Sequence, residues 1–305
     1  KNFRTPLPIF PFRRVFQSYR GFLPSPQIGG LGKKNFRRAA YTVSMPAAYT
    51  HFSLAGEVLL RLPEPPEREN ALQMYFFGAQ GADFCFFYRA LHTSELNFGR
   101  FLHNRGSYDF FRTLAALAGR DRALFPYALG YVTHYAADCV FHPYVYYLSG
   151  KSPVRHSRAE GALDFYFRKR DAGSEKLRAF GKYFNCPLDG EELSSLYFLY
   201  ALAAARTDRA PLLSSSFLRS IGRFRSYTRF SARVFAKENG SVLNASHAEW
   251  HYPKDPARVL TDGADELFER ALAESLSLID NFRQCILREE PPDRALFGKN
   301  FLSGL

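Results

Sequence analysis

The sequence of 305 residues predicts an all-α protein, built as one multi-helix domain from about Met45 to Leu305. Apolar residues recur at spacings of three and four along most of this range, no segment alternates apolar and polar residues with period two, and Val and Ile are scarce. Pro and Gly fall between the periodic segments, where they end helices. About seven helices of ordinary length make one core rather than two, so a single domain is predicted.

Capping residues and helix breakers divide this domain into elements. Thr50 is placed to cap the first helix and Asp121 the longest one, while Pro143 should kink or end the longest helix. An Asn-Arg-Gly-Ser sequence interrupts the third. The predicted helices cover residues 51–62, 66–77, 94–118, 122–142, 155–170, 190–206, 215–237 and 262–287.

The positive charge is concentrated at the N-terminal end of the chain. The formal net charge is +12, but residues 1–44 hold nine Lys and Arg and no acid, which leaves 32 basic against 29 acidic residues in the remainder. A nearly balanced domain argues against generic polyanion binding, so no specific nucleic-acid partner is expected. Residues 1–44 are predicted to be a basic, disordered N-terminal extension. The four Cys lack C-x-x-C spacing, which indicates free thiols.

The most informative stretch is THYAADCVFHPY, within the longest helix. His134, Asp138 and His142 stand four residues apart, so their side chains form a row along one helix face. His156 and Glu160 repeat this spacing in RHSRAEGALD. Asp138 is the only formally charged residue in the surrounding run ALFPYALGYVTHYAADCVFHPYVYYL, and a carboxylate in apolar surroundings is normally paired or metal-bound. Imidazole and carboxylate are the ligands of hydrolytic zinc, so the pattern predicts a metal-dependent hydrolase.

Two other interpretations fit part of this pattern. A lone buried His is more often a hydrogen-bonded structural residue than a ligand, and membrane proton relays also place ionisable groups in apolar helices. The chain contains no second apolar run of spanning length, which favours a metal-binding helix over a membrane relay. Three upstream residues are further candidate ligands: His51 in YTHF, Asp83 in GAQGADFCFF and His103 in FLHNRG.

These motifs together resemble the bacterial zinc-dependent phospholipases C. YTHF, GAQGADFCFF, FLHNRG, THYAADCVFHPY and RHSRAEGALD follow one another in the order of that family, across about 110 residues. A single H-x-x-x-E is a weak signal, whereas an ordered series of His, Asp and Glu motifs is a strong one. The helical remainder of the chain is consistent with the length of the family.

The resemblance implies two or three zinc ions per chain. One zinc site would be formed by Asp83, His103, His134 and Asp138. A second would be formed by His142, His156 and Glu160. A third metal in the family is held by the N-terminal amine, a His that matches His51 and the bridging carboxylate, here Asp138. The chain departs from the family pattern at this third site, because residues 1–44 precede the first motif.

The function implied by the resemblance is that of a phospholipase C, a hydrolase that releases diacylglycerol and a phosphorylated headgroup. Zinc lowers the pKa of a bound water and clamps a phosphoryl oxygen, and Asp83 is the candidate to orient or deprotonate that water. Two alternatives stay open: a single-strand nuclease or nucleotidase with a similar zinc cluster, and a non-catalytic, zinc-stabilised lipid-surface protein. The expected partner is a phospholipid or another phosphodiester, with transient contact to a membrane surface. No signal peptide or transmembrane segment is recognisable, so a cytoplasmic location is expected.

Several further residues have two interpretations each. Asp164 could accept a hydrogen bond from a ligand imidazole or belong to a solvated helix face. His247 and His251 have ligand-like spacing, but Gly and Pro near them favour a structural loop, and His92 is predicted to be solvated. Aromatic residues around the GAQGAD loop could line an apolar mouth or pack in an ordinary core. These aromatic residues are Tyr75, Phe76, Phe77, Phe84, Phe86, Phe87 and Tyr88.

Overall fold

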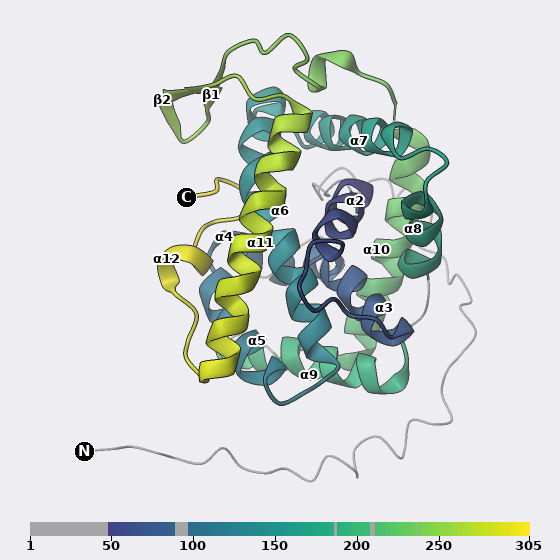
Figure 1. Ribbon diagram of the computed structural model, residues 1–305, viewed down its shortest axis with the longest axis vertical. Helices are drawn as coiled ribbons and strands as arrows, with labels where there is room; N and C mark the ends of the chain where they lie inside the picture. The colour runs from purple at the N-terminus through teal and green to yellow at the C-terminus, as the bar shows by residue number, and fades with distance from the viewer. Residues whose placement is uncertain (1–47, 89–96, 186–187, 208–210, 236) are drawn as a thin grey trace. The chain divides into compact units, whose positions relative to one another are not determined.

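Helices dominate the part of the chain that the structure describes, which confirms the predicted all-α fold (Figure 1). The structure is a computed structural model that describes residues 48–88, 97–185, 188–207, 211–235 and 237–305. These residues belong to one compact unit, Arg38–Leu305. The predicted extension over residues 1–44 lies outside the described residues, as does His92.

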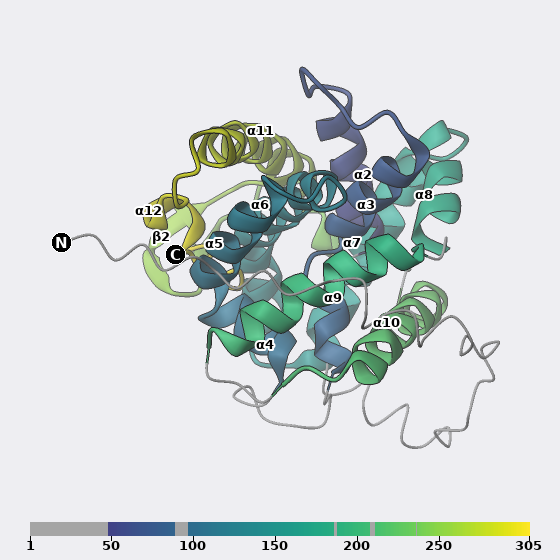
Figure 2. The same cartoon turned by 90° about the horizontal axis from the view of Figure 1, so that it is seen from below.

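The helix α6 (Leu124–Ser149) is the element on which the others pack. It contacts α11 (Ala264–Arg288) and α3 (Glu69–Gly78) most extensively, and also α7 (Pro153–Arg170), α2 (Ala48–Leu59) and α5 (Ser107–Ala118). In Figure 2, α6 lies between α11 on one side and α2 and α3 on the other. Its sequence is apolar on all sides, as expected of a helix that is buried all round. No helix within the described ranges is both long enough and apolar enough to span a bilayer.

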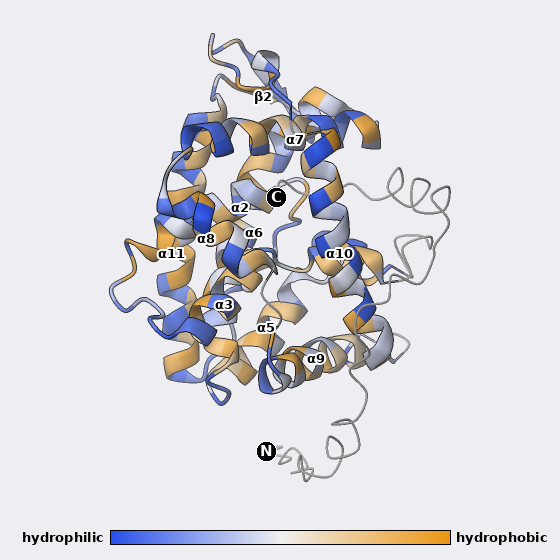
Figure 3. Ribbon diagram, turned by 90° about the vertical axis from the view of Figure 1, so that its right-hand side faces the viewer, coloured by the Kyte–Doolittle hydropathy of each residue, from blue (hydrophilic) through white to orange (hydrophobic). Residues whose placement is uncertain are grey.

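The remaining elements surround this centre. Hydrophilic and hydrophobic residues alternate along α7 and α10, which is typical of helices with one face on a core (Figure 3). The further helices are α4 (Phe98–Asn104), α8 (Glu175–Asn185), α9 (Gly190–Ala205), α10 (Ser214–Val234) and α12 (Arg294–Phe297), with short 3-10 turns η2 (Asp83–Phe87) and η3 (Gly240–Val242). The strands β1 (Trp250–Tyr252) and β2 (Asp255–Leu260) form an antiparallel hairpin.

Three differences from the predicted elements have physical reasons. The longest helix, α6, continues past Pro143 to Ser149. A proline removes a single backbone donor, and tight packing around the helix compensates for that loss. The helix α8 was missed although Phe180 and Phe184 pack into the core one turn apart. The hairpin was missed because its strands are short and β2 is largely exposed, so neither carries a clear alternating pattern.

Close backbone contact joins α3 to α6. A Cβ atom added at Gly130 would lie 2.0 Å from the carbonyl oxygen of Tyr75, and one added at Gly78 would lie 2.2 Å from that of Tyr127. Only glycine therefore allows the two helices to approach this closely. The approach matters for the site, since α3 leads directly into the turn that carries Asp83, and α6 carries the row of predicted ligands.

Replacing Gly130 with Ala should destabilise the fold by about 1–3 kcal/mol, because the added methyl group forces α3 and α6 apart. The measurement is the midpoint of thermal unfolding. Gly222→Ala is the matched control, because Gly222 is also helical but has no atom within 4 Å of an added Cβ. Its unfolding midpoint should be unchanged or higher. Equal midpoints for the two variants would contradict this account of the helix crossing.

Candidate metal centre

All eight side chains predicted as metal ligands are buried and meet in one cluster. They come from five elements, since α2 carries His51, η2 begins with Asp83, α4 carries His103, and α6 and α7 carry the others. Three groups within the cluster have ligand atoms close enough together to hold a metal ion. These groups are His51, His134 and Asp138; Asp83, His103 and His134; and His142, His156 and Glu160.

Asp138 is at the centre of this arrangement. Its Oδ2 lies 3.3 Å from Nε2 of His134, one helical turn away, and 3.6 Å from Nε2 of His103. Its Oδ1 lies 3.3 Å from Nε2 of His51 and 3.7 Å from Nδ1 of His142. The row along α6 predicted from the spacing is therefore present, and side chains from α2 and α4 complete it. The two oxygen atoms of Asp138 thus face different imidazoles, which would allow this carboxylate to bridge two metal ions.

The group Asp83, His103 and His134 joins three elements. Nε2 of His103 lies 3.1 Å and Nε2 of His134 lies 3.8 Å from Oδ1 of Asp83. Nδ1 of His103 lies 2.8 Å from the carbonyl oxygen of Gly99, which can only accept a hydrogen bond. Nδ1 must therefore carry the proton, which leaves the Nε2 lone pair directed into the cluster. This is the usual way in which an outer partner orients a metal-binding imidazole.

The group His142, His156 and Glu160 has a similar design. Oε1 of Glu160 lies 2.9 Å from Nε2 of His156, one turn earlier on α7, and 3.5 Å from Nε2 of His142. Nδ1 of His142 donates a hydrogen bond to the carbonyl oxygen of Phe301, at 3.2 Å. The backbone of residue 301 thus fixes the tautomer of His142. Sequence reasoning missed this contact.

Asp83 reaches the cluster through a turn that requires glycine. Gly81 has a φ of +55°, and a Cβ atom there would lie 1.9 Å from Cδ2 of His134. The side chain of Asn97 then joins η2 to α4, because its amide donates to the carbonyl oxygen of Phe86 and its oxygen caps the first turn of α4. These local features hold Asp83 and His103 together.

Unsatisfied polar atoms provide a test of whether this cluster suits a metal. Buried side-chain atoms rarely lack a hydrogen-bond partner, and each one that does costs stability. Ligand atoms on a zinc ion with bonds of about 2.1 Å stand about 3.4 Å apart in a tetrahedron, close to the separations measured here. Both the spacing of the ligand atoms and the buried atoms that lack a hydrogen-bond partner therefore fit a bound metal ion. The buried atoms without a hydrogen-bond partner include Nδ1 of His51, Oδ2 of Asp83, both ring nitrogens of His134, Oδ2 of Asp138, Nδ1 of His156 and Oε2 of Glu160.

Burial and neighbouring charges shift the pKa values of the cluster in opposite directions. Burial raises the pKa of Asp83 well above its ordinary value, and the charge of Asp138 adds to this shift. Burial also opposes ionisation of Asp138, but neighbouring imidazoles, His134 foremost, outweigh it and lower its pKa. Burial raises the pKa of Glu160 to about 7 and lowers that of His156 to about 4. A bound cation would resolve this conflict, since it favours ionised carboxylates and neutral imidazoles.

The other residues singled out in the sequence have structural contacts, and one of them, Phe86, packs its ring on His103 with the centroids 4.7 Å apart. Asp164 is buried, and it accepts hydrogen bonds from the backbone amide (2.8 Å) and hydroxyl of Thr50. It therefore fixes the first turn of α2, which leads into His51. Of the two alternatives for Asp164, the solvated face is wrong, and the hydrogen bonds to its carboxylate come from Thr50 rather than from a ligand imidazole. His247 and His251 are exposed, and Nδ1 of His251 bonds to the carbonyl oxygen of Pro256. All seven aromatic residues near the GAQGAD loop are buried, which supports core packing over a solvent-facing mouth.

A small pocket reaches the cluster from the side of α2 and α7. Five of its lining residues are polar and three are apolar. The lining residues are Thr50, His51, Asp138, Phe141, His142, Val145, Glu160 and Leu163. A larger cavity of about 410 Å³ lies between α6, α11 and the hairpin, and none of the eight cluster residues lines it. The small pocket is therefore the relevant one for chemistry at the cluster.

Comparison with known proteins identifies the region that contains the cluster. A family model described as zinc dependent phospholipase C matches residues 50–205, half of the chain. All eight cluster residues fall within this range. No curated protein and no solved structure matches the chain.

Removing bound metal should lower the thermal unfolding midpoint, because the buried carboxylates of Asp83, Asp138 and Glu160 then lack a compensating cation. Free zinc at about a hundred times its Kd would stabilise the folded chain by roughly 2.7 kcal/mol relative to the chelator-treated chain. Differential scanning calorimetry measures the shift. Zinc should restore the midpoint, and magnesium, which prefers oxygen ligands, should not. A midpoint that is insensitive to chelator would argue against a metal in this cluster.

Proposed function

The chain belongs to the zinc-dependent phospholipase C family, and we propose that it hydrolyses a phospholipid to diacylglycerol and a phosphorylated headgroup. The observation that carries this proposal is the convergence of His, Asp and Glu side chains from five elements on one buried cluster. The cluster lies within the residues that the family model matches.

The proposed roles follow from the contacts. Zinc, when bound, lowers the pKa of a water towards about 7 and polarises a phosphoryl oxygen. One ion would be held by Asp83, His103, His134 and Asp138, a second by His142, His156 and Glu160, and a third by His51 with Asp138; the number of ions is two or three. The hydrogen bonds from His103 to Gly99 and from His142 to Phe301 hold a proton on each Nδ1 and orient the rings so that each Nε2 faces the cluster.

Asp83 is proposed to orient the attacking water and accept its proton. Its Oδ1 faces His103 and His134, while its Oδ2 is buried and has no hydrogen-bond partner among the described residues. The proposed proton acceptor is thus a buried atom of the cluster that has no other hydrogen-bond partner among the described residues.

The pocket lining supports a lipid over a nucleic acid as substrate. Phe141, Val145 and Leu163 form an apolar wall beside His142 and Glu160. An apolar wall beside the cluster suits the glycerol and acyl part of a lipid better than a nucleoside. Neither Lys nor Arg is among the residues that line this pocket, whereas single-strand grooves carry clustered cations.

Asp83→Asn and Glu160→Ala should each lower headgroup release from mixed phospholipid vesicles by at least about a hundredfold. His251→Ala is the matched control, because His251 is exposed and its ring bonds to the backbone of Pro256 rather than to the cluster. The activity of this variant should equal that of the unaltered chain. A colorimetric assay of water-soluble organic phosphate measures the release.

The same preparations should also be assayed for cleavage of single-stranded DNA. Cleavage of DNA without release of headgroups would show a nuclease instead, and turnover of neither substrate by a zinc-loaded chain would favour a non-catalytic zinc protein. An equal loss in His251→Ala would mean that the active site lies elsewhere.

A further inference from the structure

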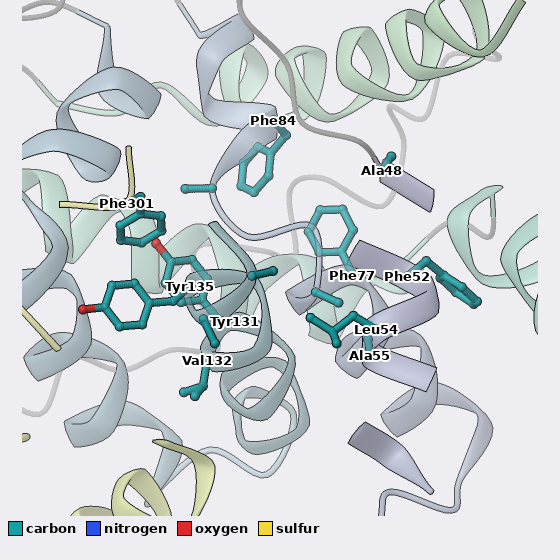
Figure 4. Packing of buried hydrophobic residues seen from close by; sticks show 14 of the residues in the cluster. Ala48, Phe52, Leu54, Ala55, Phe77, Phe84, Tyr131, Val132, Tyr135 and Phe301 are labelled. Carbon is teal, nitrogen blue, oxygen red and sulfur yellow. The ribbon is translucent and has the colours of Figure 1, made fainter. Parts of the chain in front are cut away.

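The C-terminal segment, defined here as residues 298–305, reaches the metal cluster from far outside the region that the family model matches. It follows α12 and runs beside α6, where the chain ends (Figure 1). Its one aromatic residue, Phe301, is fully buried and lies beside Tyr131 and Tyr135 of α6 (Figure 4).

Phe301 contacts three of the predicted ligands. Its carbonyl oxygen accepts the hydrogen bond from Nδ1 of His142 at 3.2 Å, and its amide donates to the carbonyl oxygen of His103 at 3.0 Å. Its ring centroid lies 4.8 Å from that of His103 and 5.9 Å from that of His134. Because His134 is shared by two groups, this one residue touches at least one ligand from each of the three candidate metal groups.

The contact to His142 has a defined chemical consequence. A carbonyl oxygen only accepts, so it keeps the proton on Nδ1 and leaves the lone pair of Nε2 facing Glu160, 3.5 Å away. The other candidate acceptor near Nδ1 is Oδ1 of Asp138, at 3.7 Å. If the carbonyl moved away, His142 could turn towards Asp138, and its Nε2 would no longer face the group that includes His156.

The segment is fixed in place by contacts at both ends. The amide of Lys299 donates to the hydroxyl oxygen of Tyr135 at 3.1 Å, and the side-chain amide of Asn300 donates to the carbonyl oxygen of Asn104, just after His103. On the other side, the hydroxyl of Tyr252 in β1 donates to the carbonyl oxygen of Ser303. The hairpin and the end of α4 thus hold residue 301 against the cluster.

We infer that Phe301 is a positioning residue for the metal centre, and that the C-terminal segment closes the group His142, His156 and Glu160 by holding His142 in its metal-binding tautomer and orientation. This inference rests on the proposed zinc-dependent function. It means that the metal centre is not complete within residues 50–205, the range of the family match. The ligand His142 needs the backbone carbonyl of Phe301, which lies 159 residues further along the chain.

The test compares Phe301→Ala with Phe297→Ala in the full-length chain. Both residues are fully buried phenylalanines of the same region, but the ring of Phe297 packs on Phe111, Tyr135 and Phe282 rather than on a ligand. Both variants should lower the unfolding midpoint. Only Phe301→Ala should weaken zinc binding, by about 10–100-fold for at least one ion, measured by competition with a chromophoric chelator well below the unfolding temperature.

Three outcomes would overturn the inference, and a fourth would overturn its premise. Zinc affinity equal to that of the unaltered chain in a folded Phe301→Ala would overturn it, and so would an equal loss of affinity in Phe297→Ala. If Phe301→Ala does not fold, Phe301→Leu keeps most of the apolar volume, and it should still bind zinc several-fold more weakly; unchanged affinity there also contradicts the inference. An unaltered chain that binds no zinc would instead remove the proposed function itself.

Discussion

The buried carboxylate of Asp138 is the constraint on which the rest of the structure depends. It lies in the middle of a helix whose surroundings are apolar, where an uncompensated charge would cost several kcal/mol. Four imidazoles surround it, from α2, α4 and α6. Asp83 and Glu160 bring two more buried carboxylates nearby. Burial lowers the pKa values of His103, His134 and His156, which disfavours the positive charge that these imidazoles would need to balance the carboxylates. A bound cation would explain why so many ionisable side chains are buried together.

The fold can be understood as the means of bringing these side chains together. The glycines at the α3–α6 crossing set the distance between those helices, and Gly81 lets the following turn pass His134 so that Asp83 enters the cluster. The C-terminal segment then covers the cluster from the side of His103 and His142. Packing around α6, rather than any single loop, therefore determines the geometry of the ligands.

Much of this arrangement could be predicted from residue types and spacing. The row on α6 follows from helical periodicity, and a lone acid in an apolar run signals that a partner must exist. The ordered motifs indicated that Asp83, His103 and His51 belong to the same site, and the structure brings them together. Their identity as zinc ligands stays a prediction. The backbone contacts could not be predicted: the carbonyl oxygens of Gly99 and Phe301 orient two ligands, yet a backbone carbonyl leaves no signal in residue type.

The central claim is that the cluster is a zinc centre, and anomalous scattering at the zinc absorption edge tests it most directly. Crystals of the full-length chain grown with zinc should show two or three anomalous peaks within the cluster. Each peak should lie about 2.0–2.2 Å from imidazole nitrogen or carboxylate oxygen atoms, one among Asp83, His103 and His134 and another among His142, His156 and Glu160. Anomalous peaks only at surface residues, or none in a chain with an intact cluster, would contradict the account.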